Sequence, residues 1–313
     1  MTNVFLINSY LTYLVARLVL EKEGYSRDQS IFVFFRGIRP LDPTRYVAYD
    51  FKSLVVDINM PHFPTYLKFY KGQRLKADLF RQIRSVTQGK EFKLHTFQTN
   101  ARVVQLVRSM PECVGTDVLE EGSCVYELGS DELDRLYRRP IRKKEKFWNL
   151  LNYGTSIKEP GFAEKGLHCY CLFDDAFRGA EKKTPLFDLP KILDVFKPRP
   201  VIEAGSAIFV HTYFDPPSPI LLDVYLALVT QMSKQYSGRP LYHRFHPSQD
   251  SRSREVISMR LAKNGLETKE LPGSEPIESY VFSPQPFTFI GWDSSVFHYA
   301  RRMGKEVVVA GHG

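Results

Sequence analysis

The chain has 313 residues, of which 43% are hydrophobic and 25% charged, and its formal net charge at pH 7 is +8. This length and composition suit two globular domains, and only four cysteines exclude a disulfide scaffold. The positive charge favours an acidic partner, which can be nucleic acid, an anionic membrane surface or an anionic substrate.

The first half alternates strand and helix patterns. Apolar residues such as Leu11, Leu14 and Leu18 recur at helical spacing, and Asn8 and Ser9 before them are good helix-starting residues. Strand, helix, strand, helix predicts a mainly parallel sheet with helices on both faces. The predicted strands are Val4–Ile7, Ile31–Phe35, Leu54–Ile58, Phe92–Phe97 and Asp117–Leu119, and the predicted helices are Leu11–Glu23, Leu75–Arg84 and Ala101–Met110.

Two cysteines lie in the next apolar segment. Cys169 and Cys171 alternate within Leu167–Phe173, so on a strand they share one face. We expect two buried thiols rather than a metal site, because two further ligands at suitable spacing are not evident.

A break in the pattern at Lys197–Pro200 predicts a connector, because two closely spaced prolines prevent a helix. The sequence thus predicts two α/β domains, residues 1–197 and 198–313, with a cleft between them where ligands bind. The second domain has predicted strands at Ala207–His211, Pro240–Arg244, Glu267–Leu271, Phe287–Ile290 and Glu306–Ala310, and predicted helices at Pro219–Tyr236, Ser253–Asn264, Pro276–Phe282 and Ser295–Gly304.

The most basic stretch is Arg135–Lys146, which contains Tyr137 and is followed by Phe147 and Trp148. The default interpretation of such a charge run is a solvated face. The alternative is peripheral contact with an anionic membrane, because aromatic rings beside lysine and arginine suit a lipid headgroup layer.

A first polar cluster, Glu120-Glu121-Gly122-Ser123, follows a predicted strand. Ligands bind at the carboxyl ends of strands in open α/β sheets, and a carboxylate there can act as a general base towards an alcohol. Two adjacent carboxylates at a partly buried edge repel, so the pKa of one is expected to rise. A solvated acidic turn is the alternative.

A second cluster contains His243, His246 and Pro247. On one strand the two histidines face opposite sides, which disfavours a shared metal ion. Pro247 restricts His246 to an extended conformation at the strand end, where an imidazole can donate to a phosphate or protonate a leaving group. A surface histidine before a turn is the alternative.

A third cluster, Gly291-Trp-Asp-Ser294-Ser295, lies between a strand and a helix. Serine hydroxyls and backbone N–H groups at a helix N-terminus form an anion site, although plain N-capping by Ser294 is compatible with the same pattern. Nearby, Glu278 at a helix start can hydrogen-bond a ribose or merely complement the helix dipole.

These clusters, in this order, resemble the motifs of inverting bacterial sialyltransferases of the two-domain GT-B type. The shared marks are Glu120-Glu121-Gly122, His246-Pro247 and Ser294-Ser295, and the segments Phe5–Ser9 and Leu167–Phe173 are also similar. The resemblance implies two Rossmann-like domains, the first binding the acceptor and the second binding CMP. One departure is that the sequence ends just after its last predicted strand, without a helix that crosses back to the first domain.

The resemblance also implies roles for individual residues. Glu121 would be the general base, with Glu120 as the competing candidate, and His246 would meet the departing CMP phosphate as acid or electrostatic stabiliser. The implied donor-binding residues are Ser294 and Ser295 at the phosphate, Glu278 at the ribose or cytosine, Pro247 beside the histidine, and Ser123.

The function implied is metal-independent transfer of sialic acid from CMP-sialic acid to a hydroxyl of a cell-surface glycan, with no cofactor. A transferase for another CMP-activated acidic sugar, such as Kdo, is one alternative. A basic nucleic-acid-binding α/β protein is the other, although no nucleic-acid-binding motif occurs and no such partner is expected. With no secretory signal and no apolar run of about eighteen residues, the sequence predicts a cytoplasmic protein, with peripheral contact at the inner face of the membrane as a further interpretation.

Overall fold

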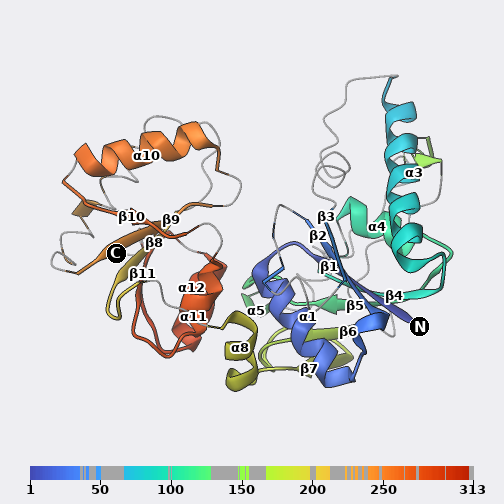
Figure 1. Ribbon diagram of the computed structural model, residues 1–313, viewed down its shortest axis with the longest axis horizontal. Helices are drawn as coiled ribbons and strands as arrows, with labels where there is room; N and C mark the ends of the chain where they lie inside the picture. The colour runs from blue at the N-terminus through green and yellow to red at the C-terminus, as the bar shows by residue number, and fades with distance from the viewer. Residues whose placement is uncertain are drawn as a thin grey trace. The chain divides into compact units, whose positions relative to one another are not determined.

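The chain folds into two compact units, Met1–Asp188 and Leu189–Gly313, each of which is described by itself (Figure 1). The structure, a computed structural model, describes residues 1–35, 38, 40–41, 47–50, 67–97, 99, 101–127, 147, 149–151, 153–154, 167–197, 202–211, 223, 227, 230–231, 235, 239–246, 249–263, 265–272, 275–292 and 294–309.

The described strands of the first unit form one seven-stranded parallel sheet in the order β3-β2-β1-β4-β5-β6-β7. The order reverses direction between β1 and β4, as in doubly wound nucleotide-binding folds. The strands are β1 (Thr2–Ile7), β2 (Ser30–Phe34), β3 (Val47–Asp50), β4 (Phe92–Thr96), β5 (Cys113–Leu119), β6 (His168–Cys171) and β7 (Lys182–Pro185).

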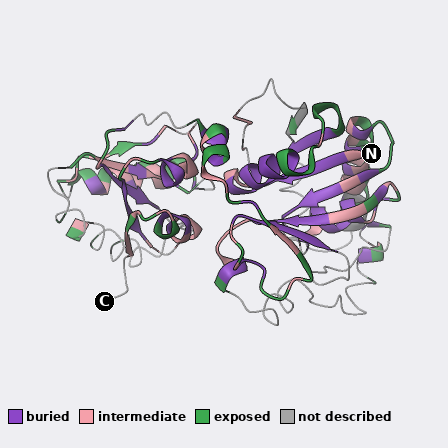
Figure 2. Cartoon of the chain, turned by 90° about the horizontal axis from the view of Figure 1, so that it is seen from below, coloured by how far each residue is buried: buried purple, intermediate pink, exposed green. Residues whose placement is uncertain are grey.

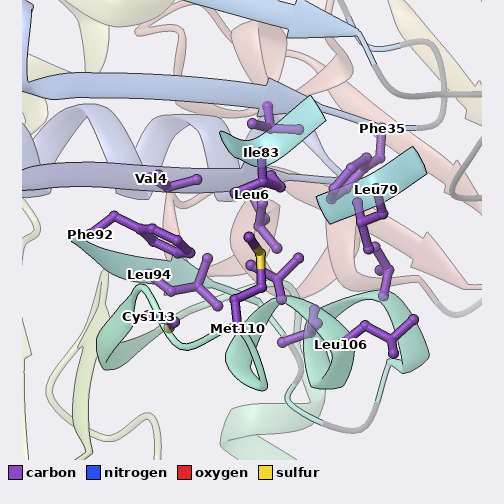
Figure 3. Packing of buried hydrophobic residues seen from close by; sticks show 14 of the residues in the cluster. Val4, Leu6, Phe35, Leu79, Ile83, Phe92, Leu94, Leu106, Met110 and Cys113 are labelled. Atoms are coloured by element: carbon purple, nitrogen blue, oxygen red, sulfur yellow. The ribbon is translucent and has the colours of Figure 1, made fainter. Parts of the chain in front are cut away.

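Helices cover both faces of this sheet, and its central strands β1, β2 and β4 are buried along almost all of their length (Figure 2). One face, with Phe5 and Phe32, packs against α1 (Tyr10–Glu23), where Tyr13 meets the Phe32 ring edge-on at 5.8 Å. Val4 and Leu6 point to the opposite face and join the core under α3 (Leu67–Thr87) and α4 (Arg102–Arg108), as Figure 3 shows.

The start of α1 lies at the carboxyl ends of the parallel strands, where the candidate site residues of this unit are found. Ser9 caps this helix by accepting a hydrogen bond from the Thr12 N–H at 3.0 Å, which confirms the predicted helix start. The helix ends at Gly24, whose φ of 65° is the left-handed conformation that favours glycine. Two shorter elements of this unit are the 3₁₀ helix η1 (Arg27–Gln29) and α5 (Cys124–Glu127).

The second unit contains a five-stranded parallel sheet in the order β10-β9-β8-β11-β12. Its direction reverses between β8 and β11, so it repeats the plan of the first unit. Its strands are β8 (Ala207–Val210), β9 (Leu241–Arg244), β10 (Lys269–Glu270), β11 (Thr288–Gly291) and β12 (Glu306–Val309), and its helices include α8 (Leu189–Phe196), α10 (Ser251–Lys263), α11 (Ile277–Phe282) and α12 (Ser295–Arg302).

The core of the second unit lies between the sheet and α10. Phe209 of β8 and Ile290 of β11 are fully buried there, together with Leu261 of the helix. On α11, Phe282 stacks on Phe196 of α8 at 6.0 Å. This contact places α8 in the second unit, so the unit begins at Leu189, earlier than the boundary expected at residue 197.

Several elements differ from the sequence-based expectations. The patterns did not predict β3, β7 or α8, and β7 (Lys-Lys-Thr-Pro) has no apolar alternation because it is an edge strand paired only with β6 among the described strands. The expected strand Leu54–Ile58, the basic stretch Arg135–Lys146 and Pro247 lie outside the described residues. Of the expected helix Pro219–Tyr236, the described positions are helical. No helix among the described residues has the length and apolar character to cross a bilayer.

The four cysteines are thiols in unlike surroundings. Cys169 and Cys171 lie on one face of β6 and are fully buried, as predicted, and burial raises the pKa of each thiol to about 12. Cys113 is buried in the first core, whereas Cys124 in α5 is half-buried.

Candidate active site

Glu120 and Glu121 follow β5 directly, but they lie in different surroundings. Glu120 is completely buried, and both of its carboxylate oxygens accept short hydrogen bonds. The Tyr126 hydroxyl donates to one oxygen at 2.6 Å, and the Leu172 backbone N–H donates to the other at 2.6 Å. Burial and the adjacent carboxylate raise the pKa of Tyr126, so the phenol keeps the proton that it donates. Glu120 therefore ties β5 to α5 and to the end of β6.

Glu121 is half-buried and turns away from β6, toward the end of β1, which lies two strands from β5 in the sheet. The Asn8 side-chain amide donates a hydrogen bond to Glu121 Oε1. Asn8 is 3% exposed, and its own carbonyl oxygen accepts from the Thr12 hydroxyl at 2.9 Å. Because Thr12 occupies the carbonyl oxygen, the NH₂ group is the end of the amide that faces Glu121.

Asn8 is a further candidate site residue, to which the sequence analysis gave no role beyond starting a helix, although it lies in the similar segment Phe5–Ser9. It comes directly after a buried strand, which is the signal that could have identified it. Ser123, the other predicted residue of this cluster, lies at the start of α5, where its carbonyl accepts the Tyr126 N–H at 2.9 Å. These residues gather at the carboxyl edge of the first sheet.

The second unit also presents its predicted site residues at the carboxyl edge of its sheet. His246 is exposed two residues beyond β9, whereas His243 on β9 is 3% exposed. The prediction that the two histidines face opposite sides assumed one continuous strand, and His246 lies beyond the end of β9, so it stays a prediction.

His243 belongs to a buried aromatic cluster rather than to the edge. Its ring lies 5.5 Å from that of His211 and 4.8 Å from that of Phe245. Burial lowers the pKa of His243 to about 4 and that of His211 to about 3. Both imidazoles are therefore neutral at pH 7, whereas His246 is the exposed member of the three.

Ser294 and Ser295 begin α12, which follows β11. Ser294 has extended backbone dihedrals (φ −151°, ψ 149°), and its side chain caps the helix by accepting from the Val296 N–H at 3.4 Å. The Phe297 N–H donates to the Ser294 carbonyl oxygen at 2.9 Å, and the Ser295 N–H at the very start of the helix is the backbone group that could meet an anion.

Gly291 brings this turn close to β8. Its φ is 153°, and a Cβ atom at this position would lie 2.4 Å from the Val210 carbonyl oxygen. Only glycine allows the chain to leave β11 this close to the neighbouring strand.

Glu278 lies in the first turn of α11, near a loop that Arg244 organises. Burial raises the pKa of the Glu278 carboxyl, and the Arg244 guanidinium opposes that rise. The same guanidinium donates to the Pro272 and Glu275 carbonyl oxygens at 2.6 and 2.7 Å. Sequence analysis missed Arg244, because its partners lie some thirty residues further along the chain.

Each sheet thus gathers one set of candidates at its carboxyl edge. The first unit presents Glu121 beside the buried Glu120, and the second presents His246, Glu278 and the Ser294-Ser295 turn. In the part of the chain that the structure describes, no three carboxylate, imidazole or thiol groups converge as metal ligands.

No protein-family model matches the sequence, and no curated protein matches it either. Solved structures do match. A 2,6-sialyltransferase from a Photobacterium species, crystallised with CMP and lactose, is 12% identical with a TM-score of 0.51, over 95% of this chain and 69% of that one.

Two UDP-N-acetylglucosamine 2-epimerases match equally well. A putative one from Listeria monocytogenes is 10% identical with a TM-score of 0.55, over 99% of this chain and 78% of that one. One from Neisseria meningitidis, bound to UDP-GlcNAc, is 12% identical with a TM-score of 0.52, over 98% and 82%. At such low identity the likeness concerns the fold, and it confirms the prediction: the chain consists of two Rossmann-like α/β domains of the GT-B glycosyltransferase type.

Proposed function

We propose that the chain is an inverting sialyltransferase, which moves sialic acid from CMP-sialic acid to a hydroxyl group of a cell-surface glycan without a metal ion. The observation that carries this proposal is the half-buried Glu121 carboxylate, held by the Asn8 amide at the carboxyl edge of the first sheet. Glu120 has both oxygens engaged, so of the two predicted candidates Glu121 is the general base.

The reaction is a single displacement. An acceptor hydroxyl oxygen forms a bond to the anomeric carbon while the bond from that carbon to the CMP phosphate oxygen breaks. The hydroxyl proton passes to Glu121, and the bonding electron pair leaves with CMP. The transition state resembles an oxocarbenium ion, as in glycoside hydrolysis.

The second unit stabilises the departing phosphate. His246 is solvent-exposed and can donate a hydrogen bond or a proton to it, while Ser294 and Ser295 offer hydroxyl and N–H donors at the start of α12. Glu278 accepts from the ribose or cytosine, at a position supported by Arg244. These fixed donors supply the charge stabilisation that a divalent cation provides in other transferases.

Titration calorimetry with CMP, UMP, GMP and UDP, each with a chelator present, tests the donor class. We expect CMP to bind selectively and the Ser294→Ala/Ser295→Ala variant to bind it at least about tenfold more weakly, because charge-assisted hydrogen bonds to phosphate are lost. Hydrolysis and transfer assays with CMP-sialic acid and CMP-Kdo then identify the sugar.

The fold likeness to UDP-N-acetylglucosamine 2-epimerases favours a second candidate, an enzyme acting on a UDP-sugar. Selective binding of UDP over CMP would replace the sialyltransferase proposal with this one. Binding of neither nucleotide would overturn both.

A further inference from the structure

Arg244, the last residue of β9, donates hydrogen bonds to one short stretch of backbone in the second unit. Its guanidinium contacts the Pro272 and Glu275 carbonyl oxygens at 2.6 and 2.7 Å, and the Leu271 carbonyl oxygen at 3.4 Å. The Leu271 N–H in turn donates to the His243 carbonyl oxygen at 2.9 Å. A planar guanidinium carries five N–H donors in a fixed fork, so it can hold several carbonyls in one arrangement. Arg244 therefore ties this stretch of backbone to the end of β9.

The stretch that Arg244 holds leads into α11. Pro276 directly precedes this helix, and its carbonyl oxygen accepts the Ser279 N–H at 3.1 Å. The Glu275 carboxylate accepts a hydrogen bond from the Tyr280 hydroxyl, and Tyr280 is almost completely buried. The start of α11 is thus fixed from two sides, from β9 through Arg244 and from the core through Tyr280.

Glu278 lies in the first turn of α11, so its placement depends on the backbone that precedes the helix. Burial raises the pKa of the Glu278 carboxyl, and the Arg244 guanidinium opposes that rise, which favours the ionised form. An ionised carboxylate has two acceptor oxygens and can accept from both the 2′ and the 3′ hydroxyl of a ribose. The arginine therefore acts on both the position and the charge of this acceptor.

The same arginine lies two residues before His246 in the chain, so it stands between the groups assigned to phosphate and to ribose. We propose that Arg244 is a positioning residue that fixes the spacing between His246 and Glu278, and thereby makes the second unit select a ribonucleotide over its 2′-deoxy analogue. This inference rests on the proposed function for the assignment of these two residues to the donor nucleotide. It holds for any base and for any transferred sugar.

Titration calorimetry with CMP and 2′-deoxy-CMP, each with a chelator present, tests the proposal. In the unchanged chain we expect CMP to bind at least about tenfold more tightly, because the deoxy analogue lacks a hydroxyl that donates to a carboxylate. In Arg244→Met we expect this ratio to fall to about twofold or less, because the carboxylate no longer meets the ribose. The affinity for 2′-deoxy-CMP should stay within about threefold, because the phosphate contacts remain. A general loss of structure would instead weaken the binding of both nucleotides.

Arg244→Lys separates position from charge, and as the milder variant it also serves if Arg244→Met does not fold. Lysine keeps the positive charge but lacks the planar fork, so it cannot hold the three carbonyls in one arrangement. We expect the ratio to stay below about threefold in this variant. Glu278→Gln should lose the ratio as well, and the Arg244→Lys/Glu278→Gln double variant should lose no more than either single variant. Full recovery of the ratio in Arg244→Lys would assign the effect to charge alone and overturn the positioning role.

Arg239→Met is the matched control. Arg239 lies two residues before β9, near the other end of the strand, and its side chain is 50% exposed beside Glu306 at 3.9 Å. This variant should bind both nucleotides as the unchanged chain does. Circular dichroism and thermal unfolding check that each variant is folded.

Three further results would overturn the proposal: equal affinities for CMP and 2′-deoxy-CMP in the unchanged chain, a ratio that survives in Arg244→Met, or an equal loss of the ratio in Arg239→Met. Any of them, together with selective binding of CMP over UMP, would leave the sialyltransferase proposal standing. If the chain selects UDP instead, the sialyltransferase proposal falls, and the ratio measured with UDP and 2′-deoxy-UDP tests the role of Arg244 by itself. Binding of no nucleotide would overturn both.

Discussion

The two sheet edges hold their polar groups by different means. In the first unit, side chains position side chains: Thr12 orients Asn8, and Asn8 holds Glu121. In the second unit, main-chain geometry dominates. Arg244 binds backbone carbonyls of the loop before α11, and Gly291 brings the start of α12 close to β8.

This difference suits the two tasks that the proposed function assigns to the two units. A general base must present one carboxylate oxygen to a proton, so its orientation is set by partners specific to that side chain. An anion site needs several converging donors, which a loop and a helix N-terminus supply from the backbone. Side-chain changes should therefore act on catalysis in the first unit, and backbone changes on folding in the second.

The largest expected effect separates the adjacent carboxylates. Glu121→Gln keeps the shape but removes the base, and we expect kcat for sialyl transfer to fall by about 10²–10⁴-fold with the thermal unfolding temperature unchanged. Glu120→Gln replaces a buried acceptor of two hydrogen bonds, so its main effect should be a loss of about 1–3 kcal/mol of unfolding free energy. The roles assigned to the two glutamates would be wrong if Glu120→Gln abolished turnover in a stable protein while Glu121→Gln left turnover intact.

The next effect tests the main chain of the second unit. Gly291→Ala places a Cβ atom against the Val210 carbonyl at an unfavourable φ, and we expect a loss of about 3 kcal/mol or more. Gly265→Ala is the matched control, because Gly265 has a φ of 77° with open space around it, so only about 1 kcal/mol of backbone strain is added.

Urea unfolding followed by the fluorescence of Trp292, which packs against the second core, reports on this unit. A Trp148→Phe background leaves Trp292 as the only tryptophan. Equal midpoints for the two alanine variants would show that the close approach at Gly291 has no special role.

The smallest effect concerns pH and the buried histidines. Because the folded-state pKa values of His243 and His211 are about 4 and about 3, the unfolded chain binds protons below pH ~6.5 that the folded chain does not. Stability contributed by the neutral rings is therefore complete above this pH and is lost as the pH falls. At pH 5 the free energy of unfolding should be lower by about 2 kcal/mol for each of the two histidines.

His243→Leu should remove about half of that drop between pH 7.5 and pH 5 in the same Trp292 fluorescence assay. His246→Gln provides the comparison, since His246 is exposed whereas His243 is buried. An unaltered slope in His243→Leu would mean that this ring does not resist protonation in the folded unit.

Features that depend on neighbouring residues could be predicted from the sequence. The Ser9 and Ser294 caps, the burial of Cys169 and Cys171, and the buried faces of the central strands all follow from local periodicity and capping chemistry. The three motif clusters also lie at carboxyl strand ends, as a parallel sheet requires.

Features that depend on residues far apart in the chain could not be predicted from the sequence. The Asn8 amide meets Glu121 across 113 residues, and Arg244 meets its carbonyl partners some thirty residues away. The division of labour between Glu120 and Glu121 depends on Tyr126 and on the Leu172 N–H, which no pattern in the acidic turn reveals. Strand β7 and helix α8 owe their places to tertiary pairing, which periodicity alone does not report.

The four thiols are buried to different extents, so thiol reagents should label one of them, Cys124, in preference to the buried ones. Buried thiols with a pKa near 12 are almost wholly protonated at neutral pH, and the protonated form does not react with maleimides or disulfides. Cys124, the half-buried thiol, lies three residues beyond Glu121. A thiol-directed fluorophore should therefore attach to Cys124, beside the acidic turn, in the unmodified sequence.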